Sequence, residues 1–206
     1  MDRQLRAGFT LIELVAVVAI ILILAAMLLP VFEQATKSAE ATSCLANVRH
    51  LTLASQLYAS DYDEGLPPAL LDLPDNTTKS CWDVLLLPYV GSRQIYLCPA
   101  DENPTAGPAY TNSLTHSYGI NLDLTMIGGY PGASLKLTCI PQPGETILFF
   151  DLAQAFSYGW RASWGNMSQY VAARHNQACN FAFCAGNAKR IKPPETLTNT
   201  VNLWEP

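Results

Sequence analysis

The stretch that decides the fold is Gly8-Phe9-Thr10-Leu11-Ile12-Glu13, where a short charged leader meets a long apolar segment. The leader, residues 1–8, carries two arginines and one aspartate. From Leu14 to Leu29 there are 16 consecutive apolar residues. A secretory signal places its small residue after the apolar core, whereas Gly8 lies before it. Cleavage after Gly8 therefore removes the charged leader and keeps the membrane segment.

This order of features resembles the class III signal of type IV pilins and type II secretion pseudopilins. In those families prepilin peptidase cuts after the glycine and methylates the new N-terminal residue. The resemblance implies cleavage between Gly8 and Phe9 and N-methylation of Phe9, and Leu11 and Glu13 also lie at the expected spacing. It also implies three kinds of partner: prepilin peptidase, an inner-membrane assembly platform, and identical or related pilin subunits.

The apolar segment is long enough to cross a lipid membrane once. Phe9 to Phe32 spans 24 residues, and a helix rising about 1.5 Å per residue crosses a hydrocarbon core of about 30 Å with that length. Arg3 and Arg6 before the segment favour a cytoplasmic N-terminus. We therefore expect insertion in a bacterial inner membrane, followed by a periplasmic or cell-surface filament. Pro30 predicts a kink or a local opening of the helix.

The helical pattern continues beyond the membrane segment. Residues 33–40 are mostly polar, and apolar residues then recur at spacings of three and four, which is typical of an amphipathic helix. The recurring positions are Leu45, Val48, Leu51, Leu53, Leu57 and Tyr58. The sequence therefore predicts one helix from Phe9 to Tyr58 or Ala59, with residues 9–32 as membrane or filament core and residues 33–206 as one globular domain.

Turn-forming residues from Asp61 to Pro68 end the long helix, and a loop-rich section follows from Ala69 to about Ser117. Apolar runs bounded by turn residues predict the remaining elements. These are a short helix in Cys81–Val90, a strand or turn in Gln94–Cys98, a buried strand in Thr146–Phe150, and a hairpin of Asn180–Cys184 and Ala188–Lys192 around Ala185-Gly186-Asn187.

This order of elements resembles the α+β pilin-like fold, a long N-terminal helix packed on a C-terminal antiparallel sheet with long loops. Several short segments are also similar to a bacterial pseudopilin-like subgroup with a C-terminal H-x9-DG motif. His175 occupies the histidine position of that motif, but Ala185 replaces its aspartate and only Gly186 of the final pair is present. The similar segments are Cys44–Asn47, Tyr58–Tyr62, Leu87–Val90, Leu97–Pro99, Ser117–Asn121 and Arg174–Asn176.

Composition limits the classes of function. Residues 33–206 contain 10 Lys/Arg and 15 Asp/Glu, and the basic residues are scattered. Since no basic patch or stripe is present, we expect no direct binding of nucleic acid.

The six cysteines lie beyond the membrane segment, on the oxidising side of the membrane. None forms a CxxC pair, so disulfides are favoured over a zinc ribbon or covalent haem. Six cysteines allow 15 pairings, and sequence does not choose among them. We predict a Cys44–Cys98 disulfide that staples the loop region to the long helix. Cys179 and Cys184 flank one strand at an odd spacing, which points them to opposite faces.

Glu13 is the one carboxylate within the apolar segment, and such a group should have a partner or a function. In pilin-like families this glutamate is thought to meet the positive N-terminal amine during assembly. A free amine on Phe9 supplies that counter-charge. The alternative is a tolerated charge near the end of the helix that reaches the membrane interface.

Asp61, Asp63 and Glu64 offer oxygen ligands before Gly65, which suits calcium. The later glycine and glutamate of an EF-hand loop are missing, so the alternative is a solvated loop that ends the helix. No other cofactor is expected.

A nucleophile and base could in principle be built from His175, Asp151 and Ser168 or a cysteine. No GxSxG or similar signature supports this arrangement. His175 is expected instead to anchor the loop before the final hairpin, and we expect no enzymatic activity.

The sequence thus favours a structural subunit of a type IV pilus-like or type II secretion pseudopilus filament. The alternative is a membrane-anchored extracytoplasmic binding module that does not polymerise.

Overall fold

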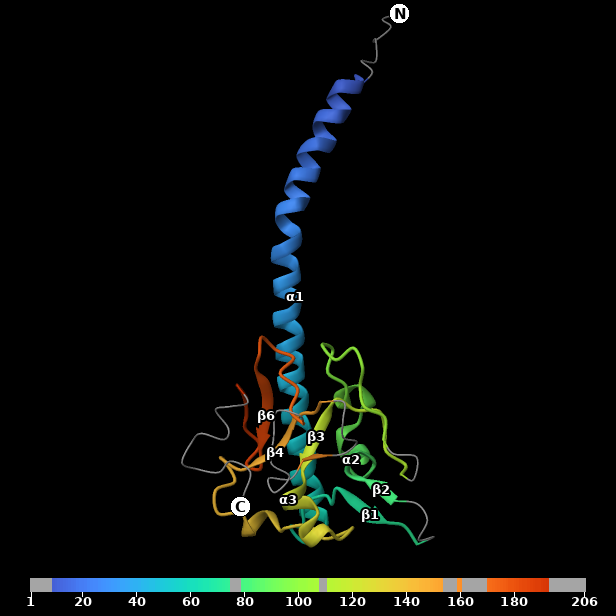
Figure 1. The fold of residues 1–206 in the computed structure, drawn as a ribbon, viewed down its shortest axis with the longest axis vertical. Helices are drawn as coiled ribbons and strands as arrows, with labels where there is room; N and C mark the ends of the chain where they lie inside the picture. The colour runs from blue at the N-terminus through green and yellow to red at the C-terminus, as the bar shows by residue number, and fades with distance from the viewer. Residues whose placement is uncertain (1–8, 75–78, 108–110, 154–158, 161–169, 193–206) are drawn as a thin grey trace, which may run out of the picture. The chain divides into compact units, whose positions relative to one another are not determined.

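The computed structural model describes residues 9–74, 79–107, 111–153, 159–160 and 170–192 (Figure 1). The leader with Gly8 lies outside these residues, as does Ser168. The chain divides into two compact units, Met1–Ala39 and Glu40–Pro206, and each is described by itself below.

One long helix dominates the N-terminal unit and continues into the second. Helix α1 runs from Leu11 to Asp61, within about two residues of the predicted bounds. The helix continues through Pro30, and the predicted kink or local opening there stays a prediction. Among the described residues, α1 is the one helix long and apolar enough to cross a membrane. The large apolar side chains from Phe9 to Phe32 are 46–82% exposed.

Within the second unit, α1 buries one stripe and exposes the other. The buried positions recur at helical spacing, as an amphipathic helix against a core requires. They are Ala41, Cys44, Val48, Leu51, Thr52, Ala54, Ser55, Tyr58 and Ala59.

The stripe packs against a five-stranded sheet with the order β5-β3-β4-β6-β7. The pairs are antiparallel except β3 with β5, which is parallel. Figure 1 shows β3, β4 and β6 beside the C-terminal part of α1. The strands are β3 (Tyr118–Asn121), β4 (Ile147–Asp151), β5 (Gly159–Trp160), β6 (Cys179–Phe183) and β7 (Ala188–Ile191).

The two faces of the sheet belong to different apolar clusters. Phe149 and Ala182 join the cluster that includes the buried stripe of α1. Phe150 and Phe181 join a second cluster with Tyr170 and Val171. Alternate residues of a strand point to opposite faces, and β4 and β6 each contribute to both clusters.

The smaller elements lie between α1 and β4. A two-stranded antiparallel sheet precedes a short helix, and four further short helical turns follow before β4, one of them before β3 and three after it. They are β1 (Leu70–Asp72), β2 (Lys79–Cys81), α2 (Trp82–Val90), η1 (Arg93–Tyr96), α3 (Leu122–Thr125), η2 (Ile127–Gly129) and η3 (Leu137–Cys139).

The α+β prediction is confirmed, and so are the short helix α2, the buried strand β4 and the β6–β7 hairpin. The Gln94–Cys98 prediction was partly wrong, because a 3-10 helix occupies Arg93–Tyr96. The Ser92 hydroxyl accepts a hydrogen bond from the Gln94 N–H, which favours a helical turn over a strand.

Candidate functional site

The start of α1 is held by a reciprocal cap. The Glu13 carboxylate accepts hydrogen bonds from the Thr10 N–H at 2.9 Å and from the Thr10 hydroxyl at 2.7 Å. The Glu13 N–H donates to the same hydroxyl oxygen at 3.4 Å. Thr10-Leu11-Ile12-Glu13 is therefore a capping box, which satisfies donors that every helix N-terminus leaves free. Glu13 thus has a local partner that our sequence interpretation missed.

The helix surface beyond this cap is apolar on every side. Leu22 is 63% exposed, and neighbouring side chains around the helix are exposed to a similar degree. A helix with apolar side chains on every side is stable in lipid or inside a protein bundle, because exposure of such a surface to water is unfavourable.

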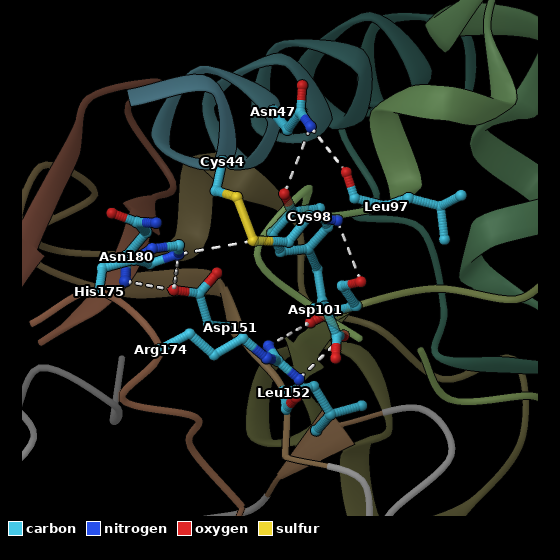
Figure 2. Close-up of a disulfide and its surroundings, with 12 residues drawn as sticks. Cys44, Asn47, Leu97, Cys98, Asp101, Asp151, Leu152, Arg174, His175 and Asn180 are labelled. Atoms are coloured by element: carbon cyan, nitrogen blue, oxygen red, sulfur yellow. Dashed lines mark hydrogen bonds and ion pairs between the residues drawn. A yellow bond between two sulfur atoms is a disulfide. The ribbon is translucent and has the colours of Figure 1, made fainter. Parts of the chain in front are cut away.

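A second group of chemically notable residues surrounds a buried disulfide in the globular unit (Figure 2). Cys44 of α1 is bonded to Cys98, with a Cα–Cα distance of 5.0 Å. One turn along α1, the Asn47 amide donates to the Leu97 carbonyl at 3.0 Å and to the Tyr118 hydroxyl at 3.3 Å. The structure therefore contains the predicted pair and adds an amide clamp beside it.

An ion pair between Arg174 and Asp101 fixes the loop that follows Cys98. The Cys98 N–H donates to the Ser117 hydroxyl at 3.0 Å. The Arg174 guanidinium contacts the Asp101 carboxylate at 2.9 Å and donates to the carbonyls of Ser117 and Leu152 at 3.3 and 2.5 Å. Four of the segments that resemble the pseudopilin-like subgroup, far apart in sequence, thus meet around this disulfide.

The imidazole of His175 completes the group. Its Nε2 atom lies 3.5 Å from the Cys98 sulfur and 3.5 Å from the Asp151 Oδ2 atom. Asp151 Oδ2 also accepts a hydrogen bond from the Asn180 N–H at 2.7 Å. Both titratable side chains are buried. We refer to Cys44, Cys98, Asp151 and His175 as the disulfide–histidine cluster.

Two protein-family models match the chain, one at its N-terminal segment and one in the region that follows. Residues 3–29 match the prokaryotic N-terminal methylation motif, and residues 34–128 match a family described as "Protein of unknown function (DUF1559)". The chain is a pilin-like protein that carries a DUF1559 segment after its prepilin-type motif. No curated protein and no solved structure matches it. The methylation motif covers Phe9 and Glu13, and it indicates that prepilin peptidase processes this pilin-like protein and that the apolar helix anchors it to the membrane.

Burial shifts the acid–base properties of the cluster in this pilin-like protein. It raises the pKa of Asp151 to about 7, because the charged carboxylate loses its hydration. It lowers the pKa of His175 to about 4, with a further contribution from the charges of Arg190 and Arg174. At neutral pH the imidazole is therefore uncharged.

His175 also begins a tight turn that leads into β6. His175 and Ala178 exchange both backbone hydrogen bonds, at 3.1 and 3.2 Å. Asn176 and Gln177 between them both have positive φ, as a type I′ turn requires. The histidine therefore lies at the loop before the final hairpin, where the sequence placed it.

The final hairpin contacts α1 through its own turn. The Gln56 amide donates to the Cys184 carbonyl at 2.9 Å. Gly186 has a φ of 93°, and an added Cβ there would meet Leu53 at 3.3 Å. Ala185, which replaces the aspartate of the subgroup motif, is exposed. Glycine is needed at this turn for both its conformation and its close approach to the helix.

Two of the three acidic residues proposed as calcium ligands have other side-chain partners. Asp61 accepts a hydrogen bond from the Tyr89 hydroxyl at 2.8 Å, and Asp63 pairs with Lys136 at 2.5 Å. Asp63 and Glu64 adopt positive φ in the turn that ends α1. The structure supports the helix-ending loop, and the calcium site stays a prediction.

The catalytic alternative is only partly assembled. His175 and Asp151 lie together, but the sulfur beside the His175 ring belongs to the disulfide-bonded Cys98. Cys179 and Cys184 are free thiols that belong to opposite clusters of the sheet, as their odd spacing predicted.

Proposed function

We propose that this protein is a structural subunit of a type II secretion pseudopilus or a type IV pilus-like filament, without enzymatic activity. The observation that carries the proposal is the exposed apolar helix from Phe9 to Phe32, which follows a prepilin-type cleavage site. Lipid covers this apolar surface in the membrane-anchored precursor, and the helices of other subunits cover it in the filament.

Glu13 sets the register of assembly in this proposal. The capping box gives its carboxylate two donors but no counter-charge. Cleavage after Gly8 creates a positive amine on Phe9, in the same subunit or its neighbour, that can neutralise the carboxylate. An unpaired charge among packed apolar helices is costly, so the pair favours one alignment over others.

The test separates the charge of Glu13 from its capping role. Full-length chains are produced in bacteria that contain prepilin peptidase and an assembly platform, and sheared filaments are counted by electron microscopy. Glu13→Gln keeps a side-chain oxygen that can cap the helix but removes the charge, and we expect it to abolish filaments while the chain stays in the membrane. Thr10→Val removes the hydroxyl of the cap and keeps the charge, and we expect filaments to persist.

Three outcomes would contradict the proposal. Normal filament yield from Glu13→Gln would remove the charge from assembly, and loss of filaments from Thr10→Val alone would assign the role to capping. A processed wild-type chain that stays monomeric would favour the membrane-anchored binding module.

A further inference from the structure

The disulfide–histidine cluster places ligand-type atoms around one point. The sulfurs of Cys44 and Cys98 and a ring nitrogen of His175 all lie within 4.8 Å of one another. Among the described residues, this is the one group of three or more histidine, cysteine and acidic side chains with that property. In Figure 2 the Asp151 carboxylate lies beside His175 and the disulfide.

The spacing around His175 is that of a tetrahedral metal site. Zinc binds sulfur at about 2.3 Å and nitrogen or oxygen at about 2.0–2.2 Å, so ligand atoms of a tetrahedron lie about 3.5 Å apart. The Nε2 atom of His175 is 3.5 Å from both the Cys98 sulfur and the Asp151 Oδ2 atom. Two edges of a sulfur–nitrogen–oxygen ligand set are therefore already present, and Asp151, which is not among the three residues whose ligand atoms all lie within 4.8 Å of one another, has to approach the sulfurs more closely to complete it.

Asp151 supplies an independent observation. Its side chain is fully buried, and its Oδ1 atom has no nitrogen or oxygen hydrogen-bond partner within the described part of the chain, with the Cys179 thiol as the neighbouring polar group. Its other oxygen is held by the Asn180 N–H at 2.7 Å. Buried carboxylates without full pairing are costly, and backbone donors of this kind orient metal-ligating carboxylates.

We propose that the reduced chain binds one zinc-type cation through Cys44, Cys98 and His175, with Asp151 as the fourth ligand. A dithiol or phosphine reductant supplies two electrons, the sulfur–sulfur bond breaks, and two protons give two thiols. The cation then forms two metal–sulfur bonds and releases those two protons to solvent. In the reverse direction an external disulfide oxidant accepts the two electrons, takes up two protons from solvent and becomes two thiols, while the Cys44–Cys98 bond reforms and the cation is released, so the metal and the disulfide exclude each other.

The cluster is buried, so the cation enters as the reduced chain folds rather than after folding. Both the disulfide and the metal–sulfur bonds connect α1 to the loop at Cys98. In a chain whose cysteines are not yet oxidised, the metal would make this connection. This site is independent of filament assembly, and its failure would leave the proposed function untouched.

The experiment uses the full chain in detergent, reduced under anaerobic conditions and freed of reductant. Cobalt(II) alone is titrated and then displaced by zinc(II) alone. We expect one cobalt per chain, with the absorption of tetrahedral cobalt–thiolate coordination, and no such absorption from the oxidised chain. Cys44→Ser, Cys98→Ser and His175→Gln should lose the thiolate spectrum or bind far more weakly. Asp151→Asn should weaken binding by about 10- to 100-fold.

Two matched variants test the assignment against the other thiols. Cys139 is exposed, and the Cys179 thiol contacts the Asp151 carbonyl oxygen at 3.7 Å. Cys139→Ser and Cys179→Ala should leave cobalt binding unchanged. If either abolishes binding, or if the reduced wild type binds no cobalt, the proposal is wrong.

A thermal melt covers the case in which reduction unfolds the chain. Zinc should restore or raise the melting transition of the reduced wild type and leave reduced His175→Gln unchanged. A reduced wild type that zinc does not stabilise would equally overturn the proposal.

Discussion

The two halves of α1 carry similar apolar side chains in opposite surroundings. In the N-terminal unit Ile21 and Leu22 are 58% and 63% exposed, whereas Val48 and Leu51 in the globular unit are 0% exposed. The first half is apolar without interruption from Leu14 to Leu29, and the second is apolar only at spacings of three and four. An uninterrupted apolar surface needs a partner on every side, while a stripe needs one. The globular unit supplies its own partner, and the N-terminal unit requires lipid or other subunits.

Removing the disulfide should produce the largest loss of stability, confined to the globular unit. The bond joins residues 54 positions apart, and the chain-entropy estimate for such a loop is about 4 kcal/mol. We expect the paired substitution Cys44→Ala with Cys98→Ala to lower the free energy of unfolding by that amount in urea titrations of the full chain in detergent. Cys139→Ala is the control with a negligible effect, and equal losses from the two variants would contradict the assignment.

The same leucine-to-alanine change should have unequal effects in the two halves of α1. Leu51→Ala removes a fully buried side chain and should cost about 2–5 kcal/mol of unfolding free energy. Leu22→Ala should change the unfolding of the globular unit by less than about 0.5 kcal/mol. Tryptophan fluorescence during chemical unfolding measures both. A large effect of Leu22→Ala would mean that the exposed half is part of the folded core.

A smaller effect concerns pH. Because the pKa of Asp151 is raised to about 7, its contribution to stability is present below pH 4 and is lost as pH rises towards 7. Because the pKa of His175 is lowered to about 4, its contribution is present above pH 6.5 and is lost as pH falls towards 4. The two slopes oppose each other between pH 4 and 6.5.

Single variants should expose these opposing slopes. Asp151→Asn should make the slope of the unfolding free energy against pH more positive than in the wild type. His175→Gln should make that slope more negative, and each change should be up to about 1.4 kcal/mol per pH unit. Unfolding free energies measured at several pH values test this. Slopes that move in the same direction in both variants would contradict the assigned pKa shifts.

Short-range patterns of apolar and turn-forming residues predicted the long helix and the last hairpin. The apolar run and the helical spacing gave α1, and the Ala185-Gly186-Asn187 turn gave the last hairpin. Strand β3 escaped prediction, because its four residues are all buried and show no alternation. The three-residue strands β1 and β2 are too short for a periodic signal.

The candidate site likewise contains one feature that a short sequence pattern encodes and one that depends on the packing of distant residues. The capping box was readable, since Thr10-Leu11-Ile12-Glu13 fits S/T-x-x-E, but the assembly interpretation of Glu13 obscured it. The contact of His175 with Cys98 joins residues 77 positions apart. No local period encodes such a contact, and only the packing of the sheet on α1 creates it.

The central claim is that the Gly8–Phe9 junction divides a removable leader from an assembly helix. Mass spectrometry of the protein isolated from membranes of cells with prepilin peptidase tests it most directly. We expect a mature chain that begins with N-methylated Phe9 and retains the whole of α1. A chain that begins at Met1, or one cut beyond residue 25, would contradict it.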